Sequence, residues 1–337
     1  MANKKIFVSI AAFEDTMILD SVKLLLKTAK DPDNIVFGFA LNYKNYPDFS
    51  EFKNKIYIIK DSDFNFPGIV KMRNEIRKLI TDEEYFLSLD AHTFFLDNWD
   101  SKLIKDLEEL KFINDKIIIS AQIGTKFEKN TSYTEWRTGG HWSVGWGLDG
   151  HSAYIDETDK RIKDNMVNDK YFINRYISCN FIFMKTEDIP KVNFPGYHAF
   201  PWEEVEQSIT CYCNGYDVVA PLIENTYILR DIDIKYSFPL DETWWEFVGT
   251  DRNDITHWRK KWILDSVEMQ IQVEKLLLTG KNDYYSLENA PRSIYDFYES
   301  IGCTEKYLDV LCTATEDEFK IISRDHKTYS PYKFDKV

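Results

Sequence analysis

The chain has 337 residues, of which 44% are hydrophobic and 15% aromatic, so it is long enough to bury a substantial core. Its formal net charge of -14 gives no whole-surface attraction to nucleic acid or anionic lipid, which disfavours both as general partners. No apolar run approaches the roughly 20 residues of a membrane span, and no signal-like segment follows Met1. We therefore expect a soluble cytoplasmic protein with no membrane partner.

The cysteines are sparse and odd in number. Only Cys211 and Cys213 lie close together, and no second pair has zinc-finger spacing. We therefore expect buried free thiols in a reducing compartment. The expectation covers all five cysteines: Cys179, Cys211, Cys213, Cys303 and Cys312.

Strand and helix signals alternate in the first part of the chain. Apolar runs rich in β-branched residues predict strands, and apolar residues at helical spacing predict helices. This alternation predicts an α/β fold with a mostly parallel sheet that is covered by helices on both faces. The predicted elements are strands 6–10, 35–41, 55–59 and 85–89 and helices 18–29 and 70–80. Ligands of such sheets bind beyond the carboxyl ends of the strands, where residues 11–15 and 90–92 fall.

The later part of the chain is less regular. Residues 117–122 and 179–184 have strand character, and the pattern becomes helical after about residue 255. We expect a catalytic domain over 1–254 and a helical extension and tail over 255–337. Residues 124–154 are rich in glycine and tryptophan, which is typical of a binding loop or lid. Its aromatic residues either stack on a sugar or acceptor or pack against the core: Trp136, His141, Trp142 and Trp146.

The sharpest local signal is the sequence YFLSLDAH at residues 85–92. An apolar strand delivers two metal-capable side chains, Asp90 and His92, into the crevice. Alternation along an extended chain would point both the same way, so that one divalent ion takes an oxygen and a nitrogen ligand. Such an ion neutralises the diphosphate of a nucleotide-sugar and of the leaving nucleotide. The alternative interpretation is that Asp90 caps the next turn and His92 lies on the surface.

Several further motifs occur in a fixed order over roughly residues 6–278. Together they resemble the GlcNAc-transferase family that modifies hydroxyproline on a cytoplasmic ubiquitin-ligase subunit. The Asp-x-His sequence is also similar, more distantly, to the polypeptide GalNAc-transferases. The motifs are IFVSIAAFED at 6–15, GIVKMRN at 68–74, LSLDAHTFFLDNW at 87–99, Trp202-Glu203-Glu204, and Gly215-Tyr216-Asp217 followed by Pro221.

The resemblance implies a GT-A fold and a retaining, metal-dependent glycosyltransferase that uses Mn²⁺ or Mg²⁺. The donor is expected to be a UDP-sugar carrying GlcNAc or glucose. By the same resemblance, Asp90 and His92 bind the metal. The residues assigned to the donor are Ala11, Ala12 and Phe13 for the base, Arg73 for the nucleotide, and Asp90.

Two positions depart from the family pattern. Trp202 stands where the family has a glycine before its paired glutamates, and residues 224–230 lack the histidine that the family places after its proline. The third metal ligand is therefore open. His257 and water molecules are the candidates, although the segment around His257 also reads as the basic first turn of a helix.

The paired carboxylates Glu203 and Glu204 are the predicted catalytic residues. A carboxylate beside the sugar can bind its hydroxyls, stabilise positive charge at the anomeric carbon, or accept the proton of the acceptor. The alternative is that the pair, together with Glu206, forms a solvated helix start. The resemblance favours the functional interpretation.

Three alternatives compete with this prediction. A transferase that glucosylates hydroxymethylated bases of viral DNA would need a basic groove, and 259–261 is the one dense basic cluster in the sequence. A nucleotidyltransferase would need a glycine-rich basic loop after the first strand, where residues 11–15 are acidic instead. A non-catalytic nucleotide-sugar-binding protein is disfavoured because Asp90 and His92 are both present. We favour a protein or glycan acceptor over DNA.

Overall fold

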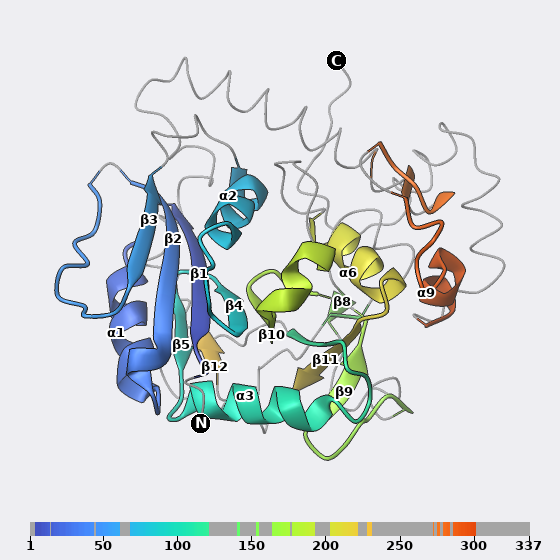
Figure 1. Cartoon of the computed structure of the whole chain (residues 1–337), viewed down its shortest axis with the longest axis horizontal. Helices are drawn as coiled ribbons and strands as arrows, with labels where there is room; N and C mark the ends of the chain where they lie inside the picture. The colour runs from blue at the N-terminus through green and yellow to red at the C-terminus, as the bar shows by residue number, and fades with distance from the viewer. Residues whose placement is uncertain are drawn as a thin grey trace.

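An eight-stranded mixed sheet forms the centre of the fold (Figure 1). The computed structural model describes residues 4–13, 15–43, 45–60, 68–120, 140–141, 153–154, 164–175, 177–192, 203–221, 228–230, 272, 275–276, 279–283 and 286–300. Within these residues the sheet has the strand order β3-β2-β1-β4-β10-β6-β11-β9. Its strands are β1 Ile6–Phe13, β2 Ile35–Asn42, β3 Ile56–Lys60, β4 Tyr85–Leu89, β6 Ile117–Ser120, β9 Tyr171–Asn174, β10 Phe181–Lys185 and β11 Asp217–Pro221.

The helices and the shorter ladders surround this sheet. The helices are α1 Ile18–Thr28, α2 Gly68–Arg77, α3 Trp99–Leu110, α6 Glu203–Cys213 and α9 Ile294–Ser300, with 3-10 turns η1 Pro32–Asn34 and η4 Thr186–Val192. Two small ladders pair β5 Thr93–Phe95 with β12 Ile228–Arg230, and β7 Gly140–His141 with β8 Ala153–Tyr154. None of the described helices is long and apolar enough to cross a membrane.

The strand order changes direction between β1 and β4. The strands β3, β2, β1 and β4 pair in parallel, whereas β10 runs antiparallel between β4 and β6. The chain adds β2 and then β3 on one side of β1, and returns to place β4 on the other side. The connection that follows β1 therefore runs toward β2, and the connection that follows β4 runs toward the other side of the sheet. Open α/β sheets bind ligands where the connections diverge in this way, at the carboxyl ends of the two strands.

Helices cover both faces of the sheet, as predicted. Because side chains alternate along a strand, β1 contributes Val8 to one apolar cluster and Phe7 to the other. The first cluster is closed by α1 and α3, and the second by α2 and α6. Figure 1 shows α1 and α2 on opposite sides of β1, β2 and β3.

The predicted strands and helices of the first ninety residues are all present, with ends shifted by a few residues. The helix α3 was not predicted, although Trp99, Leu103, Leu107 and Leu110 lie on one buried face. Hydrogen bonds join the start of α3 to the end of α1. Trp99 Nε1 donates to the carbonyl of Leu25, and the carboxylate of Asp100 accepts the backbone N–H groups of Lys30 and Asp31. The motif around Trp99 thus has a structural role.

The Gly-Tyr-Asp motif at 215–217 also has a structural explanation. Gly215 has φ +89, the left-handed conformation that favours glycine after a helix. The carboxylate of Asp217 holds both Arg292 and Arg175, with Arg292 bidentate at 2.9 and 3.0 Å. These contacts lower the pKa of Asp217 despite its burial, and they tie the segment before α9 to β11.

Other expectations fall partly or wholly outside the described residues. Cys179, Cys211 and Cys213 are buried free thiols, as predicted, while the other two cysteines lie outside. The predicted lid at 124–154 is described only at β7 and β8. The predicted division at residue 254 lies outside as well, and the two-domain organisation stays a prediction.

A substitution of Gly38 in β2 tests the close packing between β2, β1 and α2. A Cβ atom at this position would lie 2.4 Å from Cζ of Phe7 and 2.7 Å from Cγ2 of Ile76. Gly38→Ala should therefore lower the free energy of unfolding by about 1–3 kcal/mol, measured by urea denaturation. Ser9 pairs with Gly38 across the ladder, and its buried hydroxyl has no partner among the described residues. Ser9→Ala is the matched control and should not destabilise; equal stability of both variants would contradict the packing argument.

Candidate active site

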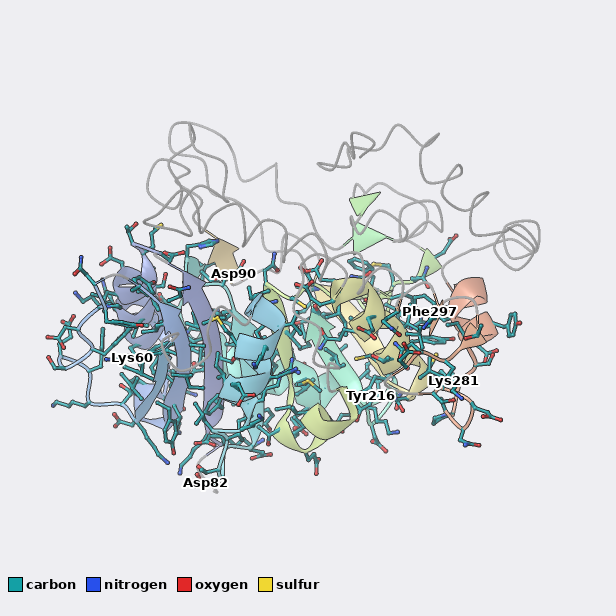
Figure 2. The ribbon with its side chains drawn as sticks, turned by 90° about the horizontal axis from the view of Figure 1, so that it is seen from above. Lys60, Asp82, Asp90, Tyr216, Lys281 and Phe297 are labelled. Carbon is teal, nitrogen blue, oxygen red and sulfur yellow. The ribbon has the colours of Figure 1, made fainter. Side chains whose placement is uncertain are left out.

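The carboxyl ends of β1 and β4 bring two acidic residues and a histidine together. Ile10 pairs with Leu89, so the residues that follow both strands emerge at one edge of the sheet. Figure 2 shows Asp90 at this edge and Asp82 at the opposite one. Residues 91 and 92 form a turn rather than the extended chain that was expected. The turn nevertheless brings His92 Nε2 to 3.9 Å from Asp90 Oδ2.

A buried carboxylate from the other strand holds the histidine. Asp15, two residues beyond β1, lies with Oδ2 2.8 Å from His92 Nδ1. Its Oδ1 accepts the backbone N–H of Met17 at 2.8 Å. Sequence reasoning placed Asp15 at the crevice without giving it a role. The sequence signal that could have indicated this role is an acidic residue shortly after the first strand. His92 is one of only six histidines that such a residue could contact.

Arg73 links this edge to the predicted catalytic glutamates. It extends from α2 and is only 6% exposed. Its Nη2 lies 3.5 Å from Asp90 Oδ1, and its Nη1 lies 3.6 Å from Glu203 Oε1. One guanidinium therefore lies between a predicted metal ligand and a predicted catalytic residue.

The first turn of α6 is held beside β4 through the loop that precedes β10. Because β10 is antiparallel to β4, its first residue, Phe181, pairs with Leu89, the residue before Asp90. Glu204 accepts the backbone N–H of Cys179 in this loop at 2.7 Å. Glu204 thus anchors the loop, and its neighbour Glu203 is brought to Arg73.

The chain matches the model of the glycosyltransferase (GlcNAc) family over residues 52–303, about three quarters of its length. This chain belongs to that family. No curated protein matches it.

The fold of this glycosyltransferase is shared with solved structures. It resembles GalNAc-T7, crystallised with UDP, GalNAc and Mn²⁺, with a TM-score of 0.59 and 11% identity over 95% of this chain. The match covers 57% of GalNAc-T7, so the chain corresponds to little more than half of that protein. A weaker similarity, with a TM-score of 0.47 and 11% identity, covers 93% of the chain and 73% of residues 1–349 of S. aureus TarS in complex with UDP. The shared fold is the predicted GT-A fold.

Glu203 carries a strongly perturbed carboxyl group in the candidate site. It is 1% exposed, and neither carboxylate oxygen has a hydrogen-bond partner among the described residues. Burial raises its pKa to about 8; the charge of Arg73 opposes this rise, and the charges of Glu204 and Asp90 add to it. Near neutral pH, Glu203 is therefore largely protonated and able to donate a hydrogen bond.

Arg73 stays charged in the same surroundings. Burial opposes its charge, but nearby acidic groups, chiefly Cys179, Asp90 and Glu203, raise its pKa above the ordinary value. Burial also raises the pKa of the Cys179 thiol well above its ordinary range, so this thiol is neutral near pH 7. With Cys179 neutral and Glu203 largely protonated, the carboxylate of Asp90 is the main counter-charge of Arg73.

The remaining predicted residues are described only in part. Ala11, Ala12 and Phe13 form the last residues of β1, at the same edge as Asp90. His257 and Trp202 lie outside the described residues, as do Trp136, Trp142 and Trp146. Among the residues that the structure describes, no three metal-ligating side chains gather around one point. The chain thus offers Asp90 and His92 as a pair.

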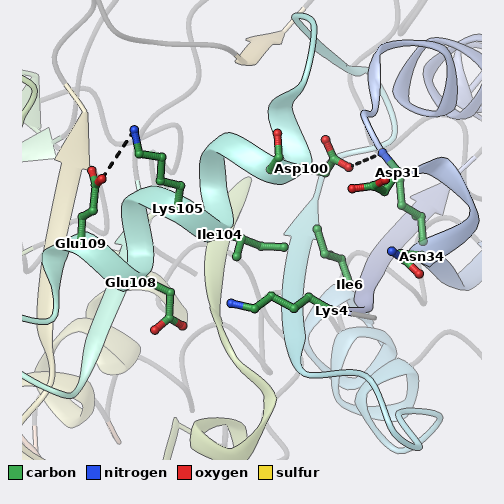
Figure 3. A pocket seen from close by; sticks show the side chains of 11 residues that line it. Lys4, Ile6, Asp31, Asn34, Asp100, Ile104, Lys105, Glu108 and Glu109 are labelled. Atoms are coloured by element: carbon green, nitrogen blue, oxygen red, sulfur yellow. Dashed lines mark hydrogen bonds and ion pairs between the residues drawn. The ribbon is translucent and has the colours of Figure 1, made fainter. Parts of the chain in front are cut away.

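A separate cavity of about 610 Å³ lies at the opposite edge of the sheet (Figure 3). It is lined by Ile6 and Ile35, the first residues of β1 and β2, and by the ion pair of Lys105 with Glu109. It is therefore remote from the carboxyl ends of the strands, and it is not part of the candidate site.

The raised pKa of Glu203 predicts a pH-dependent stability. A carboxyl whose pKa rises from 4.5 to about 8 on folding contributes stability that is present below pH 4.5 and lost as the pH rises through 8. Glu203→Gln should remove this loss, so its free energy of unfolding should exceed that of the wild type more at pH 8 than at pH 5. Urea denaturation with a chelator measures this difference.

Glu109→Gln, which removes an exposed glutamate of α3, is the control for the loss of one carboxylate. A pH-independent difference between wild type and Glu203→Gln would contradict the assigned pKa.

Proposed function

We propose that this glycosyltransferase transfers GlcNAc or glucose from a UDP-sugar to a hydroxyl of a protein or glycan acceptor, with retention of configuration and with a bound Mn²⁺ or Mg²⁺ ion. The observation that carries the proposal is the connected cluster at the β1–β4 edge. There, Asp90 and His92 lie together, and Arg73 joins Asp90 to the buried Glu203. The family assignment supports sugar transfer as the reaction of this cluster.

The donor is proposed to bind along the carboxyl ends of β1 and β4. Ala11, Ala12 and Phe13 would meet the base, since they end β1 at this edge. GalNAc-T7 shares the fold and was crystallised with UDP, which supports a UDP-sugar here. Arg73 is proposed to support donor binding indirectly, by holding Asp90 and Glu203 in place, because its guanidinium already faces both carboxyl groups.

The residues present fit a divalent ion bound together with the donor. Asp90 and His92 supply one oxygen and one nitrogen ligand, and hydrogen bonding at Nδ1 leaves Nε2 of His92 on the side of Asp90. Two protein ligands suit an ion that completes its coordination with diphosphate oxygens and water. When bound, the ion would neutralise charge on the diphosphate. His257 remains the proposed third ligand of the chain.

The two glutamates are proposed to have different tasks. Glu204 holds the loop before β10 and so fixes the position of the first turn of α6. Glu203 has both carboxyl oxygens without a hydrogen bond from the described residues, so a sugar or acceptor hydroxyl would satisfy a group that is costly to leave unpaired. We therefore assign the catalytic carboxyl to Glu203 and a supporting role to Glu204.

The acceptor is proposed to be a protein or glycan rather than DNA. DNA affinity depends on neutralising phosphates with lysine and arginine, and the net charge of -14 opposes this over the whole chain. The resemblance to the hydroxyproline-modifying family favours a protein hydroxyl. The basic cluster 259–261, on which DNA binding would depend, lies outside the described residues.

A panel of nucleotide-sugars tests the proposed function. UDP-GlcNAc, UDP-glucose and UDP-galactose are incubated with the full chain, with and without Mn²⁺, and released UDP is measured. Asp90→Ala and His92→Ala should each reduce release by about 100-fold or more, because each removes a proposed ligand of the ion. Both variants should remain folded, but Asp90→Ala should unfold at a lower temperature than the wild type, because it removes the main counter-charge of Arg73.

Asp97→Ala is the matched control, since Asp97 is an exposed aspartate that follows β5, the next strand after β4. Undiminished release in excess chelator would refute metal dependence. UDP binding without release from any donor would instead favour the non-catalytic nucleotide-sugar-binding protein.

A further inference from the structure

Asp15 makes one more contact than its turn needs. Its side chain is buried, at 5% exposure, in the connection between β1 and α1. One carboxylate oxygen accepts the backbone N–H of Met17, and its backbone carbonyl accepts the hydroxyl of Tyr43 at 2.8 Å. These two contacts fix the local backbone. The other carboxylate oxygen lies 2.8 Å from His92 Nδ1, across the crevice between β1 and β4.

This contact decides where the imidazole carries its proton. An ionised carboxylate can only accept hydrogen bonds, so Nδ1 of His92 must be the donor. A neutral imidazole has a single ring proton, and its placement on Nδ1 leaves the lone pair on Nε2. Nε2 is the nitrogen that lies 3.9 Å from Asp90 Oδ2. The lone pair is therefore on the side where Asp90 offers its oxygen.

We infer that Asp15 is a positioning residue that keeps His92 in its Nδ1–H form and orients Nε2 toward a divalent cation held with Asp90. The inference rests on the proposed function, because it presumes that a cation binds there. A carboxylate behind a metal-binding histidine also makes the ligand nitrogen more basic, and loss of such a partner typically weakens metal affinity by about 10–100-fold.

The substitution Asp15→Asn separates this role from turn formation. Asparagine keeps an oxygen that can accept the N–H of Met17 and has nearly the same shape. It replaces the other oxygen with an NH₂ group, which donates hydrogen bonds. His92 would then have to accept at Nδ1, and its proton would move to Nε2. The variant thus reverses the imidazole tautomer while the turn contact is retained.

The first measurement reads the tautomer directly and needs no metal. Long-range ¹H–¹⁵N NMR of the full chain is recorded with a chelator at pH 8. The His92 signal is identified by its loss in His92→Gln. The wild type should show the proton on Nδ1, and Asp15→Asn should show it on Nε2. A wild-type proton on Nε2 would overturn the inference even if the variant did not fold.

The second measurement is Mn²⁺ affinity in the presence of UDP, followed by the EPR signal of free Mn²⁺. Asp15→Asn should raise the Kd for Mn²⁺ by about 10–100-fold, with little change in thermal unfolding. Tyr43→Phe is the matched control, because it removes the other contact that Asp15 makes across the loop and leaves the carboxylate in place. It should bind Mn²⁺ as the wild type does.

The possible outcomes separate the two proposals. If the wild type binds Mn²⁺ and Asp15→Asn binds it equally well with the tautomer reversed, the inference about Asp15 is wrong while the proposed function stands. If the wild type binds no Mn²⁺, the metal-dependent function fails and the inference fails with it. An equal loss of affinity in Tyr43→Phe would show a general effect of the loop and would also overturn the inference.

Discussion

The site depends on one buried guanidinium. Arg73 extends from α2 and meets Asp90, at the end of β4, and Glu203, at the start of α6. The guanidinium thereby joins two consecutive elements, α2 and β4, to α6, which lies much later in the sequence. The arrangement is tolerated because the positive charge has a carboxylate partner in Asp90, while Glu203 can remain protonated. Without Arg73, the carboxylate of Asp90 would lose this charge partner.

Much of the sheet could be predicted because its strands are apolar runs with clear interruptions. Parallel strands buried on both faces, such as β1 and β4, need continuous apolar residues, and this pattern is visible in the sequence. The helix α3 was not predicted, although Trp99, Leu103, Leu107 and Leu110 have helical spacing. The order of the later strands could not be predicted, because β10 enters between β4 and β6 through pairing that no local signal specifies.

The sequence identified the residues of the candidate site, but it did not indicate the contacts among them. Asp90, His92, Arg73 and Glu203 were all selected, and the structure brings them together. Their connections were not foreseen, because contacts between α2, β4 and α6 depend on tertiary packing. Asp15 shows the same limit: an acidic residue after a strand is common, and only the pairing of β1 with β4 places it against His92.

The antiparallel insertion of β10 has a consequence for the order in which the molecule folds. The strands β1, β2 and β3 pair with partners near them in the sequence, whereas β4 returns to β1 across the segment from Ile10 to Leu89. The pairing of Leu89 with Phe181 closes a second loop of similar length on the other side of β4, and such non-local contacts form slowly. Until that step, the loop before β10 and the first turn of α6 have no neighbour at the crevice. We therefore expect Glu203 to reach Arg73 and Asp90 only after β10 has paired with β4, as a late step of folding.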